Sequence, residues 1–236
     1  MKQSIALSLC IAASPMLLVA DTLADLQKRL EKYPAKAPFA ASAKVQVNAA
    51  AQEDASRAGE CAFDVESGPA GFAFRISPKT LAASANEAEA QKQNPNAPTP
   101  TRTAMVAMNV FDIMSSIDAA SMLRDDLSGA TLIDEQTGLL RIKVKPSFAS
   151  KSRFVSEPKI ELTLWLGSDG IPTAAERVSN YAAGVAFVKG ENTRTERWEF
   201  AAFGDRLYAT RNDQSEDATA AGKHIKSSRT VSYIRK

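Results

Sequence analysis

The chain has 236 residues, a formal net charge of +2 and 44% hydrophobic residues. This length suits a single domain, and so small a net charge argues against nucleic acid, whose phosphates demand a clustered basic face. Two cysteines and one histidine provide no metal-ligand cluster of the usual spacing. We therefore expect neither a metal nor another cofactor.

Residues 1–20 have the three zones of a secretory signal peptide. Lys2 supplies a positive start, an uncharged apolar run follows, and Pro15 precedes a short segment that ends at the small residue Ala20. The apolar run is shorter than the roughly 20 residues of a membrane-spanning helix. We therefore expect cleavage after Ala20, a periplasmic or secreted location, and one mature domain over 21–236 that does not span a membrane.

The first part of this domain has one helical segment followed by strand patterns. Leu23, Leu26 and Leu30 recur at the spacing of an amphipathic helix, and alternating apolar and polar residues then indicate half-buried strands. The expected elements are a helix over 22–33, a strand from Phe39 to Val47, a loop over 49–58, and a hairpin whose strands carry Cys61–Val65 and Phe72–Ile76. Cys61 falls on the apolar side of its strand, so we expect it to be buried.

Residues 78–127 interrupt the strand pattern and form an expected helical insertion. Ser77 and Pro78 match the N-cap and the first position of a helix. The expected elements are a helix over 78–92, an extended linker over 93–101 with three prolines, a helix over 102–116, and a helix capped by Asp118 that ends at Leu127. Because the second of these helices is apolar on nearly every side, it must be covered all round or itself cover another surface.

Strand patterns return in the second half of the chain. We expect strands at 131–133, 140–144, 160–166, 172–181, 184–189, 193–203, 207–210 and 225–234, with a turn at 134–138 and a polar loop at 212–222. Short links favour an antiparallel meander, since parallel strands need crossovers of a dozen or more residues. About ten twisted strands curl or close. The expected fold class is mainly β with α (α+β): a large curved antiparallel sheet, or an unclosed β-barrel, with a helical lid.

The methionines of the mature chain all lie within one short helical stretch. Methionine is flexible and polarizable, so it suits either a greasy ligand of variable shape or an irregular core. A half-open sheet of this size can hold a ligand on its hollow side. The candidate ligand-binding residues are Met105, Met108, Phe111, Met114, Met122, Phe72 and Phe74. A lined cavity and a packed core show the same apolar pattern, so both alternatives stay open.

The order of the expected elements resembles that of a known family. An N-terminal amphipathic helix, three strands, a helical insertion and a long meander follow a signal peptide, as in the LolA/LolB-type outer-membrane lipoprotein carriers and receptors. The resemblance covers most of the mature chain and rests on element order. It implies an unclosed β-barrel whose helices form a lid over an apolar cavity for acyl chains.

Few residues offer catalytic chemistry. His224 follows a polar loop, and no nucleophile-elbow motif accompanies it to support a hydrolase. The adjacent carboxylates Asp125–Asp126 and Asp134–Glu135 fall at a helix end and at a turn, where we expect solvated side chains rather than an acid–base pair. We therefore expect no enzyme.

The expected function is binding or transport of a lipid or acyl chain in the periplasm, without catalysis. The alternative is an envelope-sensor or protein-interaction module with a filled core. In that case the basic strand face of Arg141, Lys143 and Lys145 would matter more, as a surface for an envelope protein partner.

Overall fold

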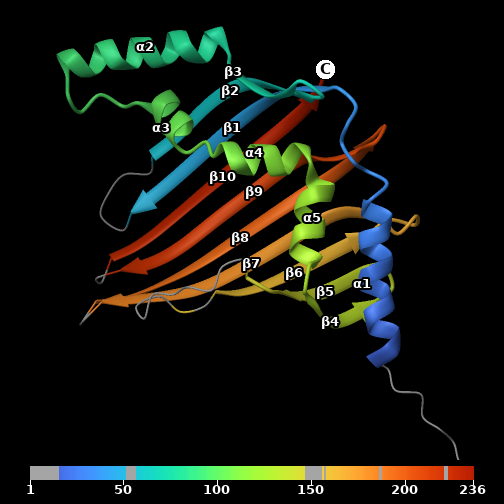
Figure 1. The fold of residues 1–236 in the computed structure, drawn as a ribbon. Helices are drawn as coiled ribbons and strands as arrows, with labels where there is room; N and C mark the ends of the chain where they lie inside the picture. Colours follow the sequence, from blue (N-terminus) through green and yellow to red (C-terminus); the bar gives the residue numbers. More distant parts are fainter. Residues whose placement is uncertain (1–15, 52–56, 147–155, 157, 186–187, 221–222) are drawn as a thin grey trace, which may run out of the picture.

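The computed structural model describes residues 16–236 except 52–56, 147–155, 157, 186–187 and 221–222. The described residues form five helices and one ten-stranded antiparallel sheet, which is curved and does not close (Figure 1). The expected fold class is therefore confirmed. The predicted signal peptide lies outside the described residues except for 16–20, which open the first helix.

The bounds of the elements are as follows. The helices are α1 (Met16–Leu30), α2 (Pro78–Gln93), α3 (Pro100–Val106), α4 (Val110–Ile117) and α5 (Ala119–Leu127). The strands are β1 (Phe39–Ala51), β2 (Arg57–Gly68), β3 (Gly71–Ile76), β4 (Thr131–Gln136), β5 (Leu139–Val144), β6 (Lys159–Leu166), β7 (Pro172–Val185), β8 (Val188–Phe203), β9 (Arg206–Ala220) and β10 (Lys223–Arg235).

The strand order explains why helices cover the sheet. The order is β3-β2-β1-β10-β9-β8-β7-β6-β5-β4, so two antiparallel meanders join where β1 pairs with β10. Strands β3 and β4 are consecutive in sequence but lie at opposite edges. The connection between them, which contains α2 to α5, must therefore cross the sheet, and Figure 1 shows α3, α4 and α5 lying across one face.

Two clusters of buried side chains fill the space between this face and the helices. One joins Leu30 of α1 and Leu123 of α5 to strands β5–β9. The other joins Ile113 and Ile117 of α4 to β1, β2 and β10. Alternate residues from Phe39 to Val47 are buried, as the period of a half-buried strand requires. The expected first strand is confirmed, and so is the amphipathic N-terminal helix, although it ends at Leu30 rather than at residue 33.

Side-chain caps mark where the inserted helices begin. Ser77 accepts a hydrogen bond from the Thr80 backbone N–H at 3.2 Å. Asp118 accepts one from the Ser121 backbone N–H at 3.3 Å. Both expected N-caps are therefore confirmed, and each satisfies a donor that the first turn of a helix leaves unpaired.

The expected single helix over 102–116 is wrong. Helix α3 starts earlier, at Pro100, which shortens the expected linker, and it ends at Val106. Helix α4 starts only at Val110, after Asn109 in an extended conformation. The Asn109 side chain accepts from the Phe111 backbone N–H at 2.9 Å, and such local capping competes with continuation of the preceding helix.

The long strands β7–β10 correct further expectations. Of the expected polar loop over 212–222, residues 212–220 belong instead to β9, which continues to Ala220, and 221–222 lie outside the described residues. The expected separate strand over 184–189 is wrong, because residues 184–185 belong to β7 and residues 188–189 to β8, while 186–187 lie outside the described residues. Alternation of apolar and polar residues does not predict the full length of these strands, because polar side chains occupy positions on both faces of the sheet.

Two shorter segments also differ from expectation. Strand β1 extends to Ala51 and β2 starts at Arg57, so both ends of the expected loop over 49–58 belong to strands, and 52–56 lie outside the described residues. Strand β4 extends to Gln136 into the expected turn over 134–138. The turn residues in the sequence therefore predicted connections that overlap the ends of the observed strands by up to three residues.

Candidate functional site

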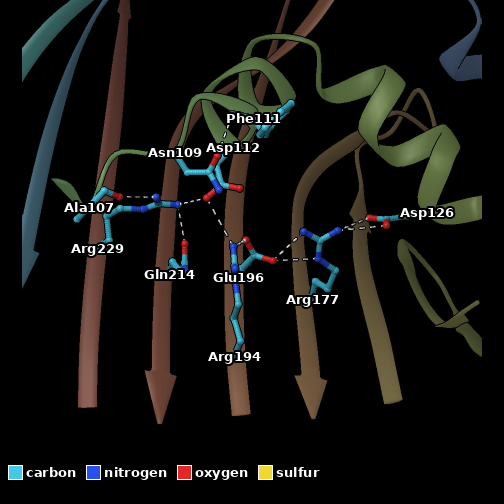
Figure 2. Close-up of polar contacts among 10 residues, drawn as sticks. All are labelled: Ala107, Asn109, Phe111, Asp112, Asp126, Arg177, Arg194, Glu196, Gln214 and Arg229. Atoms are coloured by element: carbon cyan, nitrogen blue, oxygen red, sulfur yellow. Dashed lines mark hydrogen bonds and ion pairs between the residues drawn. The ribbon is translucent and has the colours of Figure 1, made fainter. Parts of the chain in front are cut away.

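The residues predicted to bind a ligand do not line one cavity. Phe111 and Met114 are 78% and 42% exposed, and Figure 2 shows Phe111 directed away from the sheet. Met122 is buried in the core cluster beside α1. Met105 and Met108 are half-buried against the other cluster. The predicted set is therefore divided between solvent, core and the helix–sheet interface.

Little space remains beneath α4. A cavity of about 10 Å³ lies between α4 and strands β1, β9 and β10, which is room for about one water molecule. Cys61 is 3% exposed, its Sγ lies 3.7 Å from the Met108 sulfur, and burial raises the pKa of its thiol to about 11. Cys61 is confirmed as a buried residue, and this part of the covered face is a packed core.

A row of polar side chains crosses the sheet next to the helices (Figure 2). Arg229, Gln214, Glu196 and Arg177 occupy paired positions on β10, β9, β8 and β7. Arg229 also forms an ion pair with Asp112 of α4. The row contacts the helices at both ends, because Arg177 of β7 pairs with Asp126 of α5. It therefore links the inserted segment to four neighbouring strands.

Charge within this row is balanced around Glu196. Its carboxylate is 2.7 Å from Arg177 and 2.6 Å from Arg194. Burial alone would raise the pKa of Glu196, but the two guanidinium groups hold it below its usual value. Asp126 of α5 accepts two 3.2 Å hydrogen bonds from Arg177, yet burial outweighs this attraction and raises the pKa of Asp126.

A larger open space lies at the end of the sheet where β1 begins and β10 ends. This rim cleft has a volume of about 610 Å³. Its lining consists of Pro38–Ala40, Glu66–Ala73, Phe203, Arg235 and Lys236. Phe39 is 4% exposed and packs on the Tyr208 ring at a centroid distance of 4.9 Å, so one wall of the cleft is continuous with the core.

A buried arginine holds this wall in place. Arg206 is 2% exposed and its guanidinium carbon lies 5.2 Å from the Phe39 ring centroid. Its nitrogens donate to the carbonyl oxygens of Ile117 at 3.0 Å, Ala35 at 2.6 Å and Ala37 at 3.1 Å. Burial lowers the pKa of Arg206. These hydrogen bonds join the last residue of α4 to the segment that directly precedes β1. They therefore hold the Phe39 wall in place without any ligand.

Of the residues predicted from sequence, Phe72 lines the rim cleft, whereas Phe74 packs on Phe63 at a ring-centroid distance of 4.8 Å. The prediction missed Phe39, Phe203 and Arg235. The one available sequence signal was the placement of Phe203 directly before the Gly204 turn, where a large apolar side chain is unusual.

The remaining candidates lie elsewhere. His224 contacts Asp217 at the far end of the β9–β10 hairpin. Asp126 is buried in its ion pair, so the expectation that it is solvated is wrong, whereas Asp125 is exposed. Lys143 is exposed on the outer side of β5.

Within the described ranges, no three histidine, cysteine or acidic residues are grouped so as to hold a metal ion, and none of the helices there is long and apolar enough to cross a membrane.

Comparison with protein-family models, curated proteins and solved structures finds no match to this chain. The rim cleft is open and lined by aromatic side chains, whereas the space beneath α4 is filled.

Proposed function

We propose that the protein is an exported, non-enzymatic binding protein that holds an acyl chain in the rim cleft. The observation that carries the proposal is the cleft itself. Its volume of about 610 Å³ lies within the roughly 300–1,000 Å³ typical of small-molecule sites. Export is proposed on the signal-like pattern of residues 1–20.

The chemistry of the cleft favours an apolar chain. Phe39, Phe72 and Phe203 come from three distant parts of the sequence and converge on one space. Each methylene group that leaves water for such a wall contributes about 0.8 kcal/mol. A linear chain suits an open trough, because its length can lie along the wall without full enclosure. The filled space beneath α4 is not needed for this mode of binding.

Displacement of a fluorescent fatty acid from the full exported protein tests the proposal. We expect Phe203→Ser to weaken binding by about tenfold or more, since Phe203 lines the cleft. Phe111→Ser is the matched variant, because Phe111 is exposed on α4 and lies outside that lining. It should bind the probe as the unmodified protein does.

Two outcomes contradict the proposal. One is the absence of probe binding by the unmodified protein. The other is the reverse pattern, in which Phe111→Ser loses binding and Phe203→Ser keeps it. That pattern would return the site to the helical segment predicted from the sequence.

A second candidate function is docking of an envelope protein on the helices. Val106, Val110, Phe111 and Met114 are 86%, 45%, 78% and 42% exposed and follow one another along α3 and α4. Single exposed apolar residues are ordinary, but a contiguous group is typical of an interaction site. Photo-cross-linking in the envelope from position 111, compared with exposed position 199 on β8, tests it: equal yields at both positions reject docking.

A further inference from the structure

The mouth of the rim cleft carries three charged side chains, and two of them are already paired. Lys236 lies 2.8 Å from Asp64. Glu66 lies 3.7 Å from Arg75. Arg235 has no carboxylate partner among the residues that the structure describes. Among the charged side chains that line the cleft mouth, Arg235 is therefore the one for which the described residues provide no ionic partner.

The position of Arg235 joins this charge to the apolar wall. Its guanidinium carbon lies 3.8 Å from the centroid of the Phe203 ring. A guanidinium that stacks on a ring uses its flat face, and its N–H groups still point outward in the plane. Phe203 therefore contributes to the wall of the cleft and also supports the Arg235 guanidinium at its mouth.

We infer that the acyl ligand carries an anionic head group, and that Arg235 binds this head group while the chain lies against Phe203 and Phe72. The inference rests on the proposed function and specifies its ligand class. A planar guanidinium matches a carboxylate or a phosphate through two parallel hydrogen bonds. A neutral head group would leave this charge unpaired, and a cationic head group would be repelled.

Exposure limits the strength of the interaction. Arg235 is exposed, so solvent and salt weaken its attraction to an anion. The expected preference for an anionic over a neutral head group is therefore about tenfold, which corresponds to about 1.4 kcal/mol. The apolar chain supplies most of the affinity, and Arg235 supplies selectivity.

Calorimetric titration of the full exported protein with matched ligands tests the inference. Palmitate, a palmitoyl lysophosphatidate and the neutral ester monopalmitin share one chain, and inorganic phosphate has no chain. We expect both anionic lipids to bind about tenfold more tightly than monopalmitin. Arg235→Gln should remove this preference and leave monopalmitin binding unchanged, whereas Arg235→Lys should restore part of it.

Arg197→Gln is the matched control. Arg197 is also an exposed arginine over an aromatic ring, with its guanidinium carbon 5.7 Å from the Trp165 ring centroid, but it lies outside the cleft. It should leave all affinities unchanged. If every lipid fails to bind the unmodified protein, the proposed function fails and the inference fails with it.

The inference alone is overturned by any of four results. The unmodified protein binds monopalmitin as tightly as palmitate, or Arg235→Gln keeps the preference for the anion, or inorganic phosphate binds as tightly as the lysophosphatidate. Equal loss of all three lipids in Arg235→Gln also overturns it, because Arg235 would then shape the cleft rather than select the head group.

Discussion

Arg229 of β10 donates a hydrogen bond to the carbonyl oxygen of Ala107 at 3.0 Å, at the point where α3 has ended and α4 has not begun. The same guanidinium pairs with Asp112 in α4 and is bonded to Gln214 on the neighbouring strand. The last strand of the chain thereby holds the middle of the inserted helices against the sheet. Only 10% of the Arg229 side chain is exposed, so water replaces these contacts poorly.

Arg229→Gln should loosen the junction between α3 and α4. Without Arg229, the partly exposed Asp112 keeps only the longer contact with Arg194 at 3.6 Å, so we expect a loss of about 1–3 kcal/mol in the free energy of unfolding. Hydrogen exchange should accelerate at residues 105–114. The control is Arg211→Gln, since Arg211 pairs with Asp213 in an exposed position and exposed pairs contribute little. Unchanged exchange in the Arg229 variant would contradict the proposed tie.

Cys61 provides a chemical reporter of the same junction. Burial raises the pKa of its thiol from 9.0 to about 11, so the reactive thiolate is about a hundredfold rarer than for a free cysteine below pH 9. Because the pKa of the thiol is higher in the folded state than in the unfolded state, the contribution of Cys61 to stability is present below pH 9 and is lost as pH rises toward about 11.

Thiol labelling tests the shielding of Cys61. Labelling kinetics in a Cys10→Ser background should be slow at neutral pH and faster with Arg229→Gln. Equal rates in the two proteins would show that the junction does not shield the thiol.

Asp126 and Glu196 share Arg177 but should respond to pH with opposite signs. The pKa of Glu196 is lowered, so its contribution is present above its unfolded value of about 4.5 and is lost as pH falls through the lower folded value. The pKa of Asp126 is raised, so the folded state gains stability as pH falls from the higher folded value toward about 3.8.

Substitution with the neutral amide separates these two carboxyl groups. At neutral pH, Glu196→Gln should lower the free energy of unfolding by about 3 kcal/mol, because it removes the buried common partner of two half-buried guanidinium groups. Asp126→Asn should change it by less than about 1 kcal/mol, since burial already penalises the ionised form. Urea unfolding across the acidic range measures both. A larger loss in Asp126→Asn than in Glu196→Gln would reverse the assignment.

The covered half of the fold was predictable because its signals are local. Phe39 to Val47 alternate in burial as their apolar pattern indicates, and Ser77 and Asp118 cap helices as short polar residues before helical segments do. Strand β9 lacks such a local signal. Gln214 faces the helix-covered side, where it meets Arg229 rather than an apolar core, so the sequence there has the composition of a loop.

The rim cleft was not predictable from local patterns. Phe39, Phe72 and Phe203 lie far apart in the chain. They converge because β1 pairs with β2 and β10 while β2 pairs with β3, and because the β8–β9 turn comes to the same end of the sheet. Alternation shows which residues share a face, but the order of strands cannot be read from it. The methionine-rich segment stood out in sequence; in the structure Met122 is buried, Met105 and Met108 are half-buried, and Met114 is exposed.

Gly59 of β2 marks the closest approach of an inserted helix to the sheet. A Cβ atom at this position would lie 2.2 Å from the carbonyl oxygen of Pro100 and 2.9 Å from the backbone nitrogen of Ala104. Both atoms belong to the backbone of α3, so no side-chain rotation can relieve the overlap. Helix α3 is also held from the other side, because the Glu87 carboxylate of α2 accepts from the Thr101 backbone N–H at 2.8 Å.

Gly59→Ala should therefore displace α3 and lower the free energy of unfolding by about 1–3 kcal/mol, the usual range for overpacking. Gly68→Ala on the same strand is the control, since its Cβ would meet the nearest atom, Pro38 Cα, at an ordinary 3.4 Å. Loss of backbone freedom in the unfolded chain should leave that variant as stable as the unmodified protein or slightly more so. Thermal unfolding of the two variants measures the difference, and hydrogen exchange across residues 100–106 locates it. Equal stability would mean that α3 does not rest on the β2 backbone, and the packing of the covered face would have to be reconsidered from that point.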